Sequence, residues 1–210
     1  MFRIASHHHE NPGDFAWPAR PLISLSIGTA STLLAIALGF SPVACAGWIG
    51  IGGFASVVLS IGVGLCLGAC TIVASRVLVR YAPWARTMCA ALQPPLSGVA
   101  QRTLAASAIG SAIGEELLFR GLLLPTLGIV GSSIVFGAAH QLRGERGKAR
   151  WTWMIWATVM GLLFGVVFAA TGSLAGPIVA HAAINISNSR FLRDFCVASP
   201  VRPLGGLLRR

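Results

Sequence analysis

Residues 114–121 read Gly-Glu-Glu-Leu-Leu-Phe-Arg-Gly and place two adjacent carboxylates and an arginine inside a segment, 107–130, that is otherwise apolar enough to cross a bilayer. A charge near the centre of a bilayer costs about 2.5–3.5 kcal/mol on insertion scales, and ionisable residues at that depth usually serve a function. The segment therefore predicts a membrane helix that carries part of a functional site.

The composition also indicates a membrane protein. The chain has 210 residues, of which 55% are hydrophobic and 10% are charged, whereas soluble domains carry about 25% charged residues. Membrane β-barrels consist of short segments of alternating hydrophobicity, but this chain has long unbroken apolar runs. We therefore expect an all-α fold, a polytopic transmembrane helix bundle.

The apolar runs predict about six spans. They cover approximately residues 21–40, 48–73 (with an extension toward 79 as the alternative), 103–124, 132–142, 151–170 and 178–189. A full crossing needs about 20 residues, so we expect the fourth and sixth spans to be tilted, sunk within the bundle or partly re-entrant. Residues 81–92, with Tyr81 and Trp84, are expected to lie at the membrane interface.

These spans predict a single domain. The bundle is expected over residues 21–190, with its functional core at about 103–190, between a polar tail at 1–20 and a basic tail at 191–210. Glycine pairs four residues apart, at 64/68, 110/114, 161/165 and 172/176, predict that helix backbones approach closely.

The net charge of +10 does not indicate a nucleic-acid partner, because the basic residues lie in the gaps between apolar runs. Such residues set topology and contact anionic lipid headgroups. Six spans with both termini in the cytoplasm would put every basic segment inside. We therefore expect a multi-pass protein of a bacterial cytoplasmic membrane, with anionic lipid and no nucleic acid among its partners.

The two carboxylates of the opening stretch are expected to have different roles. At about 100° per residue, Glu116 and Arg120 share one face of a helix and stand one turn apart in the favourable order. Glu115 points elsewhere, so we expect it to face a cavity and to serve proton chemistry. The alternative is that both acids only form ion pairs with arginines.

Two later motifs add polar groups to the same region. Phe136 and His140 are four residues apart, and so are His181 and Asn185. Because ionisable residues in lipid turn toward one another or toward water, we expect Glu115, His140, His181 and Asn185 to line one wet pocket.

This set of groups suits hydrolysis. A carboxylate can serve as general base and an imidazole can hold the activated water. A second histidine and an amide can donate hydrogen bonds to an oxyanion. Since no serine or cysteine nucleophile stands beside a histidine, water attack on an amide is the most economical chemistry.

A zinc site is the alternative within this chemistry. Glu115, His140 and His181 could act as three zinc ligands. However, the sequence has no HExxH motif, and Asn185 would be a poor fourth ligand. We therefore expect no cofactor, with zinc kept as the alternative.

Together the three motifs resemble those of the CAAX proteases and bacteriocin-processing enzymes, known as the CPBP or Abi family, whose marks are EExxxR, FxxxH and HxxxN in this order. The resemblance covers roughly residues 103–190. It implies a glutamic intramembrane protease related to the type II CAAX prenyl endopeptidases. In such an enzyme Glu115 and His140 would activate the water, and His181 and Asn185 would stabilise the oxyanion.

The resemblance further implies that Glu116, Arg120 and Phe136 support the site, which agrees with the helical geometry of the first two. The chain departs from the family in having fewer spans than some members. Expected substrates are bacteriocin-like peptides or membrane-anchored proteins with a terminal sorting signal, in preference to prenylated CAAX proteins. A proton-coupled carrier and an immunity or scaffold protein are the non-enzymatic alternatives.

Overall fold

The computed structural model describes residues 19–93, 96, 98–140 and 147–194, and within them the protein is built of helices. The predicted all-α bundle is confirmed. In chain order the elements are α1 (Arg20–Ala37), α2 (Gly53–Tyr81), α3 (Pro83–Leu92), α4 (Gln101–Glu116), η2 (Leu117–Leu123), α5 (Leu124–Ala139), α6 (Lys148–Thr171) and α7 (Ala175–Arg193). The predicted tails at 1–20 and 191–210 lie almost wholly outside the described residues.

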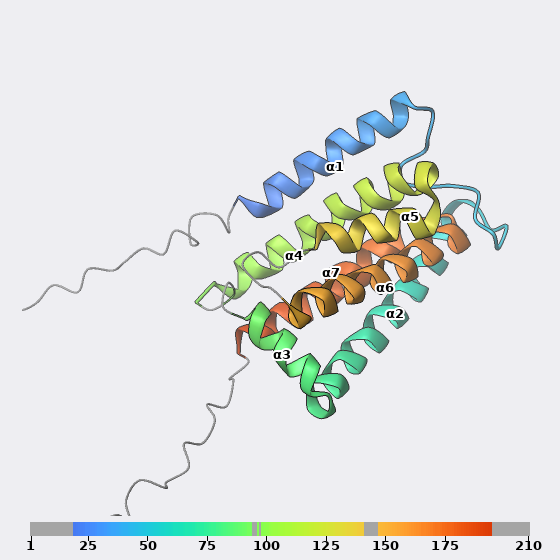
Figure 1. The fold of residues 1–210 in the computed structure, drawn as a ribbon. Helices are drawn as coiled ribbons and strands as arrows, with labels where there is room; N and C mark the ends of the chain where they lie inside the picture. The colour runs from blue at the N-terminus through green and yellow to red at the C-terminus, as the bar shows by residue number, and fades with distance from the viewer. Residues whose placement is uncertain (1–18, 94–95, 97, 141–146, 195–210) are drawn as a thin grey trace, which may run out of the picture.

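Helix α7 occupies the middle of the bundle. It packs against α2, α4 and α6, while α1 covers α4 and η2, and α5 packs on α6 and η2 (Figure 1). Within the described residues, four segments are long and apolar enough to cross a membrane: 20–37, 53–81, 101–139 and 148–171. Helix α7 is not among them, which fits the expectation that the sixth span is sunk within the bundle.

The turn predicted between the third and fourth spans is present at Gly128. This residue has φ 71° and ψ 176°, which interrupts the helical run at a conformation that glycine adopts readily. Beyond it, the chain of α5 runs back against η2 and α6 (Figure 1). The third candidate span, 101–139, therefore contains a reversal of the chain, and the returning part of α5 is short.

The second span was predicted to begin at Trp48, and this is wrong, because α2 begins at Gly53. The preceding residues form a loop whose backbone pairs with the turn between α6 and α7. Trp48 N donates to Ala169 O, and Cys45 N donates to Gly172 O. The loop thus satisfies its polar backbone groups by pairing rather than by forming helix.

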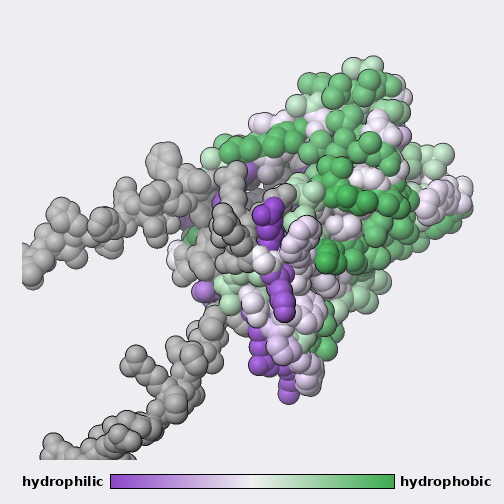
Figure 2. All heavy atoms as spheres, viewed as in Figure 1, coloured by the Kyte–Doolittle hydropathy of each residue, from purple (hydrophilic) through white to green (hydrophobic). Residues whose placement is uncertain are grey.

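Apolar side chains cover much of the outer surface of the helices, as expected for faces that contact lipid (Figure 2). Hydrophilic residues gather towards the end of the bundle that holds α3 (Figure 2). Both ends of the described chain, residues 19 and 194, lie at this same end (Figure 1). The predicted segment at 81–92 is a helix, α3, and its depth at the membrane interface remains a prediction.

Glycines let α2 and α7 touch through their backbones. A Cβ atom built on Gly64 would overlap the carbonyl oxygen of Gly176, whereas one on Gly62, half a turn away, would meet open space. The predicted role of Gly64 in close helix approach is therefore confirmed.

We expect Gly64→Ala to lower the free energy of unfolding by about 1–3 kcal/mol, because the added methyl group forces the two backbones apart. The measurement is the unfolding midpoint of the purified protein in detergent micelles. Gly62→Ala is the matched control and should leave the midpoint unchanged. Equal stability of the two variants would contradict the close approach.

Candidate active site

Four polar side chains from three helical segments meet at one point inside the bundle. Glu115 and Glu116 are the last two residues of α4, His140 follows α5, and His181 lies in the first half of α7. Glu115 Oε2 lies 3.5 Å from His140 Nε2 and 3.8 Å from His181 Nε2. Glu116 Oε1 lies 2.8 Å from His181 Nδ1. The structure therefore brings together the acid and both histidines that the sequence singled out.

The predicted pairing of Glu116 with Arg120 is present and fully buried. Arg120 Nη1 donates to Glu116 Oε1 at 3.0 Å, and its other terminal nitrogen, Nη2, donates to the Gly161 carbonyl of α6 at 2.9 Å. The side chains of Glu116 and Arg120 are 0% and 2% exposed. Because the carboxylate also contacts His181 on α7, this ion pair connects three parts of the bundle.

Arg120 stands inside η2, a stretch of π-helix at Leu117–Leu123 that follows the two acids. Single turns of π-helix inside α-helices occur frequently at functional sites. Here the π-helix begins directly after Glu116 and still allows the i,i+4 pair that a regular helix would give.

The hydrogen-bond partners of the two histidines assign their hydrogens. His140 Nδ1 lies 2.8 Å from the Phe136 carbonyl oxygen, which can only accept, so Nδ1 carries the hydrogen. His181 Nδ1 lies 2.8 Å from Oε1 of Glu116, which also accepts from Arg120, and Nδ1 therefore also donates. In the neutral rings both Nε2 atoms are then acceptors.

Three acceptors thus face one point: Glu115 Oε2 and the Nε2 atoms of His140 and His181. Acceptors can share such a space only if hydrogens lie between them. Either a proton is shared between the carboxylate and an imidazole, or the two O–H bonds of a water satisfy two of the acceptors. The arrangement is therefore suited to binding and deprotonating water.

Aromatic rings fix the orientation of both imidazoles. The Phe136 ring lies 4.3 Å from that of His140, and the Phe164 ring stacks on His181 at 5.2 Å with an interplanar angle of 24°. The Arg120 guanidinium lies over both phenylalanine rings, 4.7 Å and 5.3 Å from their centroids. These contacts hold the histidines in place and surround the ion pair with apolar walls.

Sequence reasoning found Phe136 but missed two further aromatic residues that touch the site, both on α6. Phe164 stacks on His181, and the Trp153 ring lies 6.1 Å from that of His140. Both residues stand in a continuous apolar run, where no polar neighbour distinguishes a ring that faces the site from one that faces lipid.

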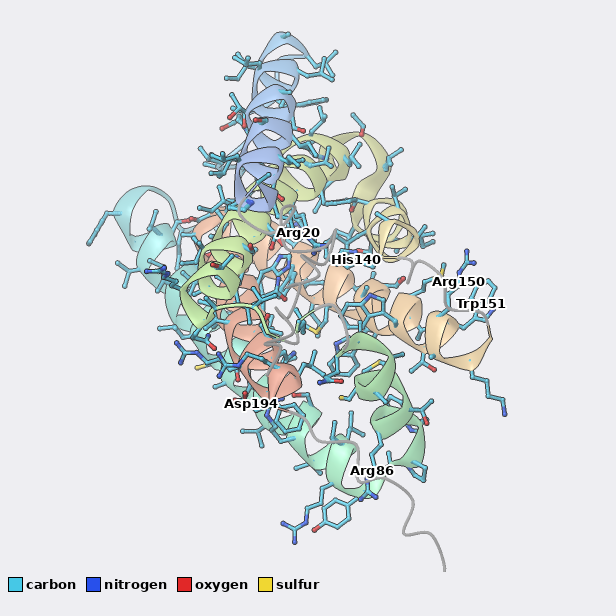
Figure 3. The ribbon with its side chains drawn as sticks, turned by 90° about the vertical axis from the view of Figure 1, so that its left-hand side faces the viewer. Arg20, Arg86, His140, Arg150, Trp151 and Asp194 are labelled. Carbon is cyan, nitrogen blue, oxygen red and sulfur yellow. The ribbon has the colours of Figure 1, made fainter. Side chains whose placement is uncertain are left out.

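Asn185 lies one turn beyond His181 on α7, at the boundary between the site and a cavity. Its amide nitrogen lies 3.5 Å from Ser111 Oγ on α4. The cavity measures about 280 Å³ and is bounded mainly by α2, α3, α6 and α7, with Arg20 of α1 also in its wall. Asn185 and Trp153 both belong to its wall, so two residues that neighbour His181 and His140 also line the cavity. Figure 3 shows His140 near the middle of the bundle and Trp151 at its outer edge.

The donor chemistry of Glu115, His140 and His181 would suit zinc, and the contact of His181 with Glu116 resembles the support that metal-bound histidines receive. However, within the residues that the structure describes, no three His, Cys, Asp or Glu side chains are placed so that they could hold a metal ion. We derive no step that uses a metal, and the absence of a cofactor stays a prediction.

We expect Arg120→Leu to destabilise the protein by about 3–5 kcal/mol, because Glu116 would remain buried without its cation. The unfolding midpoint in detergent measures the effect. Arg102→Leu, at an exposed position on α4, is the control and should change little. The double variant Glu116→Leu with Arg120→Leu should recover much of the loss, and a double variant less stable than Arg120→Leu would contradict this account.

Comparisons with known proteins single out the same part of the chain. Residues 101–187 match the family model described as "Type II CAAX prenyl endopeptidase Rce1-like". A protein of Bacillus subtilis (strain 168), described as "Uncharacterized protein YpbD", is 36% identical over 70 residues, which are 33% of this chain and 35% of that protein. The alignment thus spans about a third of the length of this curated relative. No solved structure matches the chain. The resemblance of the three motifs is therefore confirmed over residues 101–187, which are similar to the Rce1-like type II CAAX prenyl endopeptidases.

Proposed function

We propose that the protein is an intramembrane endopeptidase that hydrolyses a peptide bond with water activated by Glu115 and His140. The observation that carries this proposal is the convergence of Glu115 Oε2 on the Nε2 atoms of His140 and His181, at 3.5 Å and 3.8 Å. The family match at residues 101–187 supports a CAAX-type protease activity at the same residues.

In the proposed reaction Glu115 takes a proton from the water while the water oxygen forms a bond to the carbonyl carbon of the substrate. His140 is held by the Phe136 carbonyl with Nε2 toward the reacting water, and it positions that water. The peptide C–N bond then breaks, and the proton held by Glu115 passes to the leaving nitrogen. Proton transfer of this kind contributes about 10²–10⁴-fold to a rate.

The developing oxyanion needs donors, and His181 and Asn185 are proposed to supply them. The amide of Asn185 donates directly. His181 donates from Nε2 when both of its ring nitrogens carry hydrogens, and in that state Glu116 accepts the hydrogen on Nδ1. In this scheme the buried ion pair of Glu116 and Arg120 holds the carboxylate that the imidazolium requires.

The proposed substrate is a membrane-associated peptide or protein. The family model points to substrates of this class, and the apolar outer surface of the helices indicates that the site is reached from within or beside a membrane. Bacteriocin-like peptides and membrane-anchored proteins with a terminal sorting signal remain the specific proposals. The cytoplasmic location of both termini also remains a proposal.

We expect Glu115→Gln to lower the cleavage rate by at least about 10²-fold, because the amide keeps the shape of the side chain but accepts no proton. Cleavage is followed by mass spectrometry with the purified protein in liposomes and a co-reconstituted membrane-anchored peptide. Asp194→Asn, which removes an exposed carboxylate, should leave the rate unchanged. Full activity of Glu115→Gln would remove Glu115 from the role of base.

The same liposomes distinguish an enzyme from a carrier. A carrier would show a solute flux driven by a pH gradient, and Glu115→Gln would abolish this flux. If the wild type shows such a flux and cleaves no peptide, the carrier is favoured.

Activity is expected to survive incubation with EDTA or phenanthroline, since the proposed water activation uses a carboxylate and an imidazole. The measurement is the initial cleavage rate before and after chelation and dialysis. If chelation abolishes activity and zinc restores it, Glu115, His140 and His181 act as zinc ligands and not as proton-handling groups.

A further inference from the structure

We propose that the cavity bounded by α2, α3, α6 and α7 is the specificity pocket of the site, and that Trp153 sets the size of the uncharged apolar side chain that a substrate places beside the scissile bond. This inference rests on the proposed peptidase function and deepens it.

The position of the cavity supports this inference first. Trp153 lines the cavity, and its ring lies 6.1 Å from that of His140, at an interplanar angle of 62°. Asn185 lines it from the opposite helix, one turn from His181. A peptide whose reacting carbonyl lies between the two histidines would therefore direct a neighbouring side chain into this cavity.

The size and the walls of the cavity define what it can hold. Its volume of about 280 Å³ exceeds the roughly 150 Å³ of an apolar cavity that takes up benzene. Its walls include Trp84 and Met88 of α3 and Trp156 of α6. These side chains favour a large aliphatic or aromatic group over a small one.

The charge of the walls excludes basic side chains. Among the described residues that line the cavity are two arginines, Arg20 and Arg76, and no carboxylate. The charge of Arg76 is fixed in place: its guanidinium donates to Asn188 Oδ1 at 2.9 Å and to Ser187 Oγ at 3.0 Å, and lies 4.0 Å from the ring centroid of Phe191. A substrate lysine or arginine side chain in the cavity would lie near positive charge and would find no carboxylate among the described wall residues to pair with. The cavity therefore disfavours basic substrate side chains.

Trp153 is the wall residue best placed to set the size limit. Trp156 lines the same cavity but also packs on the buried cluster that contains Phe164 and Ile184, so its loss would disturb the histidines as well. Trp153 lines the cavity and its ring lies 6.1 Å from that of His140, so its truncation would enlarge the cavity on the side of His140. Trp151, two residues earlier on α6, is 62% exposed and offers a matched control.

The first test measures cleavage by the wild-type protein in liposomes. Its substrates are acyl-anchored peptides that are identical except at the position beside the scissile bond, which carries Ala, Leu, Trp or Lys. We expect kcat/KM to be about tenfold higher for Leu than for Ala, and at least about tenfold lower for Lys than for Leu. Trp153→Ala should raise the ratio of kcat/KM for the Trp peptide over the Leu peptide at least about fivefold, while Trp151→Ala leaves this ratio unchanged. An unchanged ratio in Trp153→Ala, or an equal change in Trp151→Ala, would overturn the proposal.

The second test reads occupancy of the cavity without catalysis. Cys89 lines the cavity and is buried, so a peptide in the cavity should shield its thiol. The test uses Glu115→Gln protein in which the other four cysteines are replaced by alanine, and it measures the rate of modification of Cys89 by methyl methanethiosulfonate. Because burial raises the pKa of the Cys89 thiol, which the charge of Arg76 partly offsets, labelling is done at alkaline pH to obtain the reactive thiolate.

The Leu peptide is expected to slow this modification several-fold, and the Lys peptide is expected to leave it unchanged. The two tests separate the inference from the function on which it rests. Protection of Cys89 without cleavage of any peptide would overturn the peptidase and keep the pocket. Cleavage that is insensitive to side-chain size, with no protection of Cys89, would keep the peptidase and overturn the pocket.

Discussion

The buried ion pair between Glu116 and Arg120 is the constraint on which the rest of the structure depends. Neither charge has access to water, so each needs the other together with further hydrogen bonds. The extra partners are the Gly161 carbonyl of α6 and the Nδ1 atom of His181 on α7. Satisfying one pair of charges therefore fixes three helical segments relative to one another and sets the orientation of a histidine in the site.

The neighbouring acid has the opposite character because the helix turns by about 100° between adjacent residues. Glu116 turns into the core and is 0% exposed, whereas the side chain of Glu115 is 27% exposed and faces two imidazole nitrogens. Glu116 is thus held in a buried ion pair, whereas Glu115 has no arginine partner among the described residues and is the acid that we propose for the chemistry. A single helix can provide both because the next element, η2, carries the arginine that neutralises only the first.

Local periodicity predicted the parts of the site that depend on one helix, such as the pairing of Glu116 with Arg120. Polarity within apolar sequence predicted that His140 and His181 would turn toward Glu115. The start of α2 was misplaced because Trp48 and its neighbours are apolar enough for a span, and their pairing with the turn after α6 depends on residues more than 100 positions away. Phe164 and Trp153 were missed because an apolar side chain in a membrane protein can face the core, the site or the lipid. The sequence does not distinguish these three surroundings.

The polarity of α7 explains why the site can lie inside a membrane protein. A helix that carries His181, Asn185 and Asn188 would be costly against lipid. It is instead surrounded by α2, α4 and α6, and α2 holds it near both ends. Towards its start, Ser60 Oγ accepts from Gly176 N and donates to the Ser173 carbonyl. Towards its end, Arg76 donates to Ser187 and Asn188. Because α2 is itself apolar on its outer face, one helix shields α7 from lipid and supplies the polar contacts that α7 needs, and this leaves His181 and Asn185 free to face the interior of the bundle.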